Sequence, residues 1–411
     1  MIARVTMAES GESRLVRFAR WSLYATVACL PLYVVRWHYG PLPTTLLETL
    51  IAFTVVLYVV ARWRDGMRRP LSTPYDIPIL LLLVAGAISI FVATDHVAAL
   101  GLYRAFFVEP VAVFYVAVDL LRRRGEIGRV LIAFAAGSSA FALLNIRAFV
   151  VALMAHAVHV GNAPSALFGN ANYVAMYMEP PVALATGLVL FAATSRWRWA
   201  GIAWLAITGA ALMLTFSKGS YVAVGALGVL VVMAVPRWRV PLFVGLAVAA
   251  FAASRLPLVS DRLVNTYGSI MGRAEIYGAT VAMIRDHPIF GVGLGGYMYK
   301  FRHYQPTPHP HDIWLTFWVE LGLLGLVAFA IILFGLLWRG VRGLRSVQQP
   351  ARAAYWGSLA ALIMWTVHGF VDTPYFKNDM SVEFWLLAAM QVVLVGQIVR
   401  TPTQEMSHTP R

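Results

Sequence analysis

The sequence predicts an all-α fold, a polytopic integral membrane helical bundle of about twelve transmembrane helices. Hydrophobic residues make up 60% of the 411 positions and charged residues only 13%, with a mean hydropathy of +0.70. Soluble globular chains carry roughly 25% charged residues. Several apolar blocks also run for about 17 to 25 residues without a charge, the length that crosses roughly 30 Å of hydrocarbon. These blocks are continuously apolar rather than alternating, which excludes the strands of a membrane barrel.

The first apolar block follows Arg14, Arg17 and Arg20 and lacks a small-residue cleavage site, so we expect it to remain as helix one. The expected spans are 17–35, 44–62, 77–94, 105–121, 130–156, 173–193, 199–215, 220–236, 240–256, 317–337, 353–371 and 381–399. The predicted organisation has three parts. Residues 1–256 hold helices one to nine, residues 257–316 form a periplasmic helical loop, and residues 317–411 hold helices ten to twelve and a cytoplasmic tail.

Lys and Arg residues alternate between the loops as the positive-inside rule requires. With the N-terminus inside, the inner groups lie at 4–20, 62–69, 122–129, 196–198, 237–239, 339–352 and 400–411, and they hold most of the 33 basic residues. We therefore expect a multi-pass protein of the bacterial inner membrane with both termini in the cytoplasm. The net charge of +14 orients the chain on this interpretation, and no nucleic-acid partner is expected.

Among the basic residues at or below the predicted outer surface, which work against the topology rule, three are candidates for a function. Lys218 stands in a polar break between two apolar spans, Arg147 lies inside a span, and Arg104 begins one. A charge within or at the edge of the membrane is a functional hypothesis by default. The alternative for each is snorkelling to the interface or a local ion pair.

The long outer loop contains a segment with a mixed apolar and charged pattern, residues 272–286, which includes Arg273 and Arg285. We expect a helix along the outer membrane surface. Its apolar face is expected to consist of Ile276, Thr280, Met283 and Ile284. The helix should stop at His287, because the following proline disfavours helix at the preceding residue.

A glycine-rich run at 291–296 and a histidine cluster follow this segment. The glycine run lacks the flanking strand and helix of a nucleotide site, so we interpret it as a tight, backbone-exposed turn. His303, His309 and His311 with Asp312 suggest a metal site, but no second ligand pair is evident, and no metal is expected. A general-base role for one histidine is favoured, because imidazole titrates near neutrality.

Four segments together resemble the O-antigen ligase and polymerase superfamily. They are Phe168–Tyr173, Thr215–Ser220, Gly272-Arg273 with Asp286–Gly293, and His311–Leu315 with Glu320–Gly325. Members of that superfamily carry a histidine, usually followed by a small amide or hydroxyl residue, then leucine, then a Glu-x-Gly step into a membrane helix. The resemblance runs from about residue 165 to 390, and the earlier helices match only in number and character.

The resemblance implies a GT-C-like glycosyltransferase without a cofactor or metal ion. The implied donor is a glycan on undecaprenyl diphosphate, and the implied acceptor is a hydroxyl of lipid A core oligosaccharide at the periplasmic face, among membrane lipids. His311 would be the base, and Arg273 and Lys218 would stabilise the leaving diphosphate. The expected substrate-binding residues are Arg147, Arg104, Arg285, Asp312 and His309.

Two residues depart from the family pattern. Asp312 replaces the usual Asn, Ser or Gln and would either raise the basicity of His311 or cap the next helix. Lys218 stands where many members have arginine, and lysine lacks the bidentate fork of the guanidinium. Glu320 is nine residues beyond His311, about 180° around a helix, so we expect a structural role for it. The polar patch 372–379 either contacts the acceptor sugar or closes a loop, and closure is favoured.

Four functions are compatible with these features, and a ligase is favoured. A polymerase would use the same chemistry with a lipid-linked glycan as the acceptor. A protein-O-oligosaccharyltransferase would be expected to carry an added outer domain, which is not visible. A transporter or flippase would be expected to show internal repeats and broken helices in both halves, and we find no convincing repeat.

Overall fold

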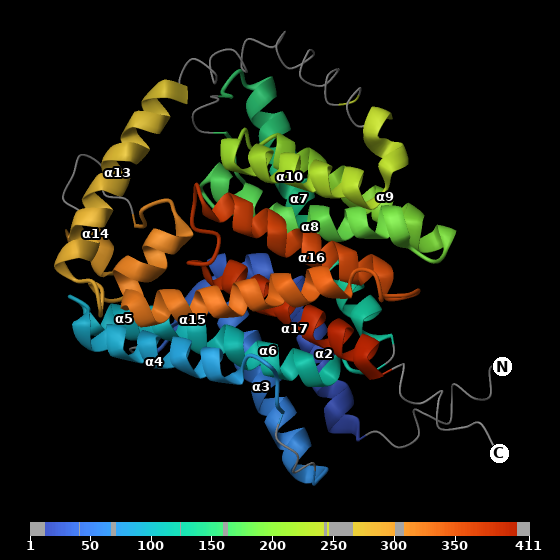
Figure 1. The fold of residues 1–411 in the computed structure, drawn as a ribbon, viewed down its shortest axis with the longest axis horizontal. Coiled ribbons are helices and arrows are strands. Elements are labelled where there is room, and N and C mark those ends of the chain that lie inside the picture. The colour runs from blue at the N-terminus through green and yellow to red at the C-terminus, as the bar shows by residue number, and fades with distance from the viewer. Residues whose placement is uncertain are drawn as a thin grey trace.

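The computed structural model describes residues 13–40, 42–66, 71–123, 125–158, 163–241, 245, 266–300 and 308–400. It is a helical bundle (Figure 1), which confirms the all-α prediction. Its α-helices are α2 Arg14–Ala28, α3 Leu46–Arg64, α4 Asp76–Val92, α5 His96–Tyr103, α6 Glu109–Leu120, α7 Glu126–Met154, α8 Ala171–Phe191, α9 Ser195–Met213, α10 Lys218–Ala234, α13 Thr266–Asp286, α14 Gly296–Lys300, α15 Ile313–Gly343, α16 Arg352–Gly369 and α17 Asn378–Arg400. Three short turns of other helix types are η1 Leu30–Val34, η2 Arg104–Val108 and η3 Pro236–Trp238.

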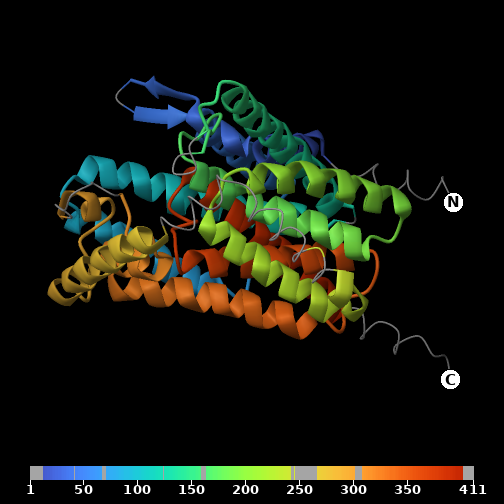
Figure 2. The same cartoon turned by 90° about the horizontal axis from the view of Figure 1, so that it is seen from above.

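One small sheet was not expected from the sequence. Strand β1, Arg36–Tyr39, pairs antiparallel with β2, Leu42–Thr45, and forms a hairpin between η1 and α3. Figure 2 shows this hairpin projecting from the end of the bundle where α13 lies. The capping box at Thr45 and Glu48 then starts α3, because each residue satisfies a backbone N–H of the other.

Eleven of the predicted spans coincide with described helices, and the predicted span 240–256 lies largely outside the described residues. Among the described residues, six helices are long and apolar enough to cross a membrane. They are Leu46–Arg64, His96–Leu120, Glu126–Met154, Ala171–Phe191, Ile313–Gly343 and Asn378–Gln397. The apolar helices α4 and α10 are shorter. The fold is therefore that of an integral membrane protein, and the count of twelve spans stays a prediction.

Basic groups predicted to face the cytoplasm gather at one end of the bundle. Arg122 and Arg339 line one pocket together with Gln397, so the ends of α6, α15 and α17 meet there. Arg20 also pairs with Glu126 at 2.6 Å, which joins the second turn of α2 to the first residue of α7. This arrangement agrees with the alternation of charge along the chain.

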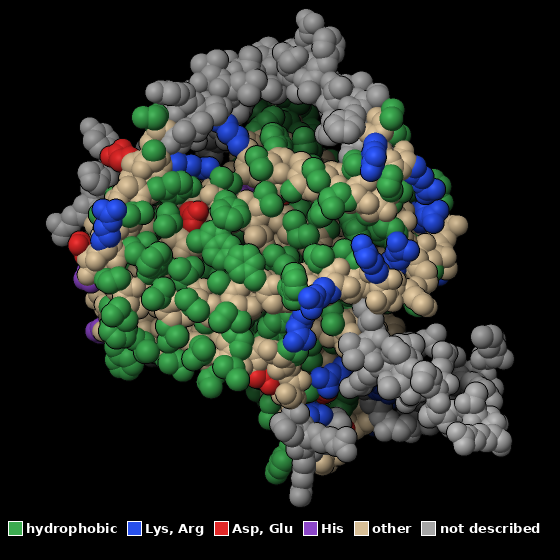
Figure 3. Space-filling view, viewed as in Figure 1, with side chains coloured by type: hydrophobic (Ala, Val, Ile, Leu, Met, Phe, Trp, Pro, Cys, Tyr) green, Lys and Arg blue, Asp and Glu red, His purple; other side chains and the backbone are tan. Residues whose placement is uncertain are grey.

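The opposite end carries the segments predicted to lie outside. Figures 1 and 2 place α13 and α14 there, beside the start of α15 and the end of α16. Between the ends, hydrophobic side chains cover the face formed by α4 and α15 (Figure 3). Because this apolar face is exposed rather than packed, it suits lipid as the surrounding solvent.

Helices α8 and α16 form the centre of the bundle and lie very close together. A Cβ atom at Gly187 would be 2.5 Å from the Ala353 carbonyl oxygen, and a Cβ at Gly357 would be 2.9 Å from Leu184 Cα. Small residues permit this approach, as in other membrane helix pairs. The close packing fixes α8 and α16 against each other below the outer end.

The glycine-rich run does form a turn, but the expectation that its backbone would be exposed was wrong. The turn is largely buried against α15, where Val292 N donates to Val319 O at 2.6 Å and Leu323 N donates to Ile289 O at 3.0 Å. Gly322, with φ 72° and ψ −173°, interrupts α15 at this contact. The exposed-turn interpretation failed because polarity along the chain does not reveal a tertiary partner for backbone groups.

Gly322→Ala tests this junction. A Cβ at residue 322 would overlap the Ile289 carbonyl, and the positive φ is costly for alanine, so we expect destabilisation of at least about 1–3 kcal/mol. The measurement is thermal unfolding of purified protein in detergent. Gly209→Ala is the matched control, because Gly209 is helical and its added methyl would meet no atom within 4 Å. Equal melting temperatures for the two variants would contradict this account.

Candidate active site

His311 lies in the turn that leads into α15. Its backbone has φ 54°, a left-handed conformation that is strained for a residue with a side chain. Asp312 is the N-cap of α15, and its carboxylate accepts from Leu315 N at 2.8 Å. The capping alternative proposed for Asp312 therefore applies. This cap fixes where the helix starts and thereby where the His311 ring is presented.

Asp372 is the partner of His311. The distance from His311 Nδ1 to Asp372 Oδ1 is 3.1 Å, and 35% of the His311 side chain is exposed, compared with 3% for Asp372. Burial by itself would raise the pKa of Asp372. The hydrogen bond and charge of His311, the charge of His368 and the Thr373 N–H instead lower this pKa to about 2. Asp372 is therefore a fixed negative charge behind a partly accessible imidazole.

Further contacts hold Asp372 in place. Asp372 N donates to His368 O at 3.0 Å, at the end of α16. Asn172 Nδ2, in the first turn of α8, donates to Asp372 Oδ2 at 3.5 Å. The Phe168–Tyr173 motif thus reaches the site through Asn172.

The preference for loop closure at 372–379 missed the role of Asp372. The available signal was its predicted position on the same outer face as His311.

Helix α13 contributes Arg273 and Tyr277. The Tyr277 hydroxyl donates to the His311 carbonyl oxygen at 3.1 Å. Burial raises the pKa of Tyr277, the positive charge of Arg273 opposes this rise, and the charges of Asp312 and Asp372 add to it. Arg273 is half-buried one turn before Tyr277, so a guanidinium lies beside the histidine turn. Sequence reasoning identified Arg273 and missed Tyr277.

Lys218 lies at the start of α10. Phe216 adopts φ 52° and Ser217 caps the helix, so Lys218 is its first residue. The next residue, Gly219, packs against His368, because a Cβ there would lie 2.5 Å from the imidazole Nε2. His368 is four residues before Asp372 on the same helix end. The structure therefore brings the Thr215–Ser220 motif to the His311–Asp372 pair.

His309 belongs to a neighbouring contact on the other side of the turn. Its Nδ1 is 3.8 Å from Glu320 Oε1, and its ring centroid is 5.3 Å from that of Phe376. Glu320 is buried and contacts His309 rather than His311. This agrees with the structural role expected for Glu320 from helical geometry.

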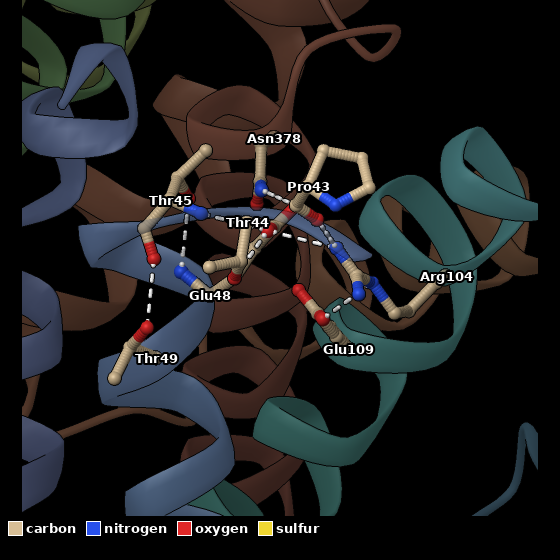
Figure 4. A network of polar contacts seen from close by, with 8 residues as sticks. All are labelled: Pro43, Thr44, Thr45, Glu48, Thr49, Arg104, Glu109 and Asn378. Carbon is tan, nitrogen blue, oxygen red and sulfur yellow. Dashed lines mark hydrogen bonds and ion pairs between the residues drawn. The ribbon is translucent and has the colours of Figure 1, made fainter. Parts of the chain in front are cut away.

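Arg104 is held in a separate network, shown in Figure 4. Its guanidinium lies 2.9 Å from a Glu48 oxygen and 3.2 Å from a Glu109 oxygen, and it donates to Pro43 O at 3.0 Å. Asn378 Nδ2 donates to the other Glu48 oxygen at 3.1 Å. Arg104 thus forms the local ion pair considered as its alternative, and it joins α3, η2 and α17.

Arg147 and Arg285 are not brought into contact with the histidine turn among the described residues. Arg147 is exposed on α7. Arg285 is exposed at the end of α13, twelve residues from Arg273 and therefore roughly 18 Å further along that helix. Their proposed substrate contacts stay predictions.

No group of three or more His, Cys, Asp or Glu side chains converges as metal ligands within the part of the chain that the structure describes. The site is instead built from one imidazole, one buried carboxylate and basic side chains on two helices. This set suits proton transfer and the binding of an anion.

Asp372→Asn tests the electrostatics of the pair. An aspartate in an unfolded chain has a pKa of about 3.9, so the lowered folded-state pKa stabilises the protein above about pH 4. This contribution is lost as the pH falls through about 2. We expect the wild type to melt at a higher temperature than Asp372→Asn at neutral pH, with the gap narrowing between about pH 4 and pH 2. A gap that stays constant across this pH range would contradict the pairing.

Comparison with known families agrees with the motifs. Residues 202–330 match the family model described as O-antigen ligase, a region that runs from α9 into α15. It includes Lys218, Arg273, His309, His311 and Asp312, whereas Asp372 lies beyond it. No curated protein matches the chain. The predicted family resemblance is confirmed: residues 202–330 carry the O-antigen ligase family region, within a helical membrane protein.

Proposed function

We propose that the protein is an O-antigen ligase of the bacterial inner membrane. It transfers a glycan from undecaprenyl diphosphate to a hydroxyl of lipid A core oligosaccharide at the periplasmic face, with inversion and without a metal ion. The observation that carries this proposal is the His311–Asp372 pair, set between basic residues of α10 and α13 at the end of the bundle predicted to lie outside.

Asp372 determines which nitrogen of His311 acts as the base. A carboxylate can only accept a hydrogen bond, so Nδ1 carries the proton and Nε2 of the neutral ring carries the lone pair. Nε2 takes the proton of the acceptor hydroxyl as its oxygen attacks the anomeric carbon. Asp372 then stabilises the imidazolium that forms, as in other histidine–carboxylate pairs.

The attack displaces the lipid diphosphate from the opposite face of the sugar. The new oxygen–carbon bond forms while the bond between the anomeric carbon and the diphosphate oxygen breaks, and the diphosphate leaves with the electron pair. Because the two bonds lie on opposite faces, the configuration inverts. Positive charge fixed near the departing oxygen lowers the barrier, and Arg273 and Lys218 are the residues assigned to this role.

His311→Ala should abolish measurable transfer by purified protein while leaving membrane insertion intact, because it removes the imidazole that is hydrogen-bonded to Asp372. The loss expected for a general base is about 10²–10⁴-fold. The assay supplies undecaprenyl-diphosphate glycan in EDTA, with and without lipid A core.

The outcomes of this assay separate the candidate functions. Product that requires lipid A core would support a ligase, whereas a ladder of longer lipid-linked glycans without it would indicate a polymerase. Full activity of His311→Ala would remove the general-base assignment. Loss of wild-type activity in EDTA, restored by a divalent ion, would overturn the metal-independent mechanism.

Arg273→Ala should lower the transfer rate at least about tenfold, and Arg273→Lys should retain part of it, because lysine keeps the charge without the planar fork. Arg285→Ala removes the same charge roughly 18 Å further along the helix and should lower the rate less, because any substrate contact there would lie away from the leaving diphosphate. The assay is initial rate at saturating acceptor. Equal losses for the two alanine variants would mean that α13 contributes a general basic surface rather than a positioned guanidinium.

A further inference from the structure

A fully buried histidine–carboxylate pair lies directly below the candidate site. His368 Nδ1, on α16, is 2.5 Å from Glu179 Oε1, on α8, and the two side chains are 1% and 0% exposed. Placing a charged or polar pair in the interior carries a desolvation cost, and breaking such a pair leaves an uncompensated group. The position of the pair within the central α8–α16 packing therefore restricts where the His368 ring can lie.

His368 also contacts the start of α10. Its Nδ1 lies 3.3 Å from Ser220 Oγ, and Gly219 packs against its Nε2 edge. Any side chain at residue 219 would collide with the ring. The first turn of α10, which begins with Lys218, therefore packs directly against the His368 ring.

This contact is not a serine–histidine–acid relay. In a relay, the serine and the carboxylate bind opposite nitrogens of the ring. Here the side chains of Ser220 and Glu179 both contact Nδ1 of His368. The arrangement fixes the position of the ring and does not pass a proton from one side to the other.

His368 also contacts Asp372, the carboxylate that holds the proposed base. The His368 carbonyl accepts the Asp372 backbone N–H at 3.0 Å, and Asp372 holds the His311 ring. We infer that His368, held by Glu179, is a positioning residue that sets Lys218 at its working distance from the His311–Asp372 pair. This inference rests on the proposed transfer reaction, and it adds Glu179 and His368 to that reaction without placing either against substrate.

The test is Glu179→Gln, which keeps the size of the side chain and removes its charge. We expect kcat to fall at least tenfold and KM for the lipid-linked donor to rise, measured on monodisperse protein in detergent. Glu126→Gln is the matched control, because Glu126 is another buried carboxylate in an ion pair but lies at the opposite end of the bundle. It should keep the wild-type kcat and KM even if its melting temperature falls.

A double-mutant cycle separates positioning from a loss of fold. If Glu179 acts through Lys218, adding Glu179→Gln to Lys218→Gln should lower kcat by no more than about twofold further, because interacting residues are not additive. A full additional tenfold loss, or wild-type kinetics in Glu179→Gln alone, would overturn the inference.

Gly219→Ala provides a second variant if Glu179→Gln does not fold. It leaves the Glu179–His368 pair chemically intact and pushes the first turn of α10 off the ring, so it should reproduce the change in kcat and donor KM. Unchanged kinetics in Gly219→Ala would contradict a functional role for the packing of α10 against His368. Absence of transfer by the wild type would instead reject the proposed function on which the inference rests.

Discussion

The arrangement of the outer end depends on the hydrogen bond between His311 and Asp372. Asp372 is buried and ionised, a state that needs compensation in an interior of low polarity. Its partners come from three places, the His311 turn, the first turn of α8 and the backbone beside it. Satisfying this one carboxylate therefore requires segments about 60 and 200 residues away in sequence to meet.

The same physical rule applies to two half-buried arginines, Arg104 and Arg273, with different outcomes. Arg104 faces two carboxylates, Glu48 and Glu109, so its charge is matched within the fold and serves to join helices. Arg273 instead lies half-buried on an outer helix, beside a tyrosine and the histidine turn. A cation matched by fixed anions stabilises structure, whereas a cation at an accessible helix face suits an anionic substrate.

The features that could be predicted from the sequence are those that depend on the pattern of neighbouring residues. Apolar length and charge alternation located eleven described helices, proline placed the end of α13 before His287, and the motif identified His311 with its capping neighbour Asp312. The long-range contact partners of the site residues could not be predicted from this short-range pattern. Glu179 and His368 lie inside apolar segments 189 residues apart, and only the packing of α8 on α16 makes them neighbours. Likewise, the glycine run gave no sign that α15 would cover it.

The two departures from the family pattern now have different physical meanings. The Asp312 carboxylate accepts from the Leu315 N–H at the cap of α15, a task that the asparagine or serine usual in the resembled family also performs well. Lys218 is the first residue of α10, where its charge adds to the positive end of the helix dipole. That placement is unfavourable for the helix by itself, and an anion near the helix start would offset it. Lysine concentrates the charge in a compact ammonium that is less directional than a guanidinium. The position of this helix start on His368 therefore matters more here than it would for an arginine, whose fork defines its own geometry.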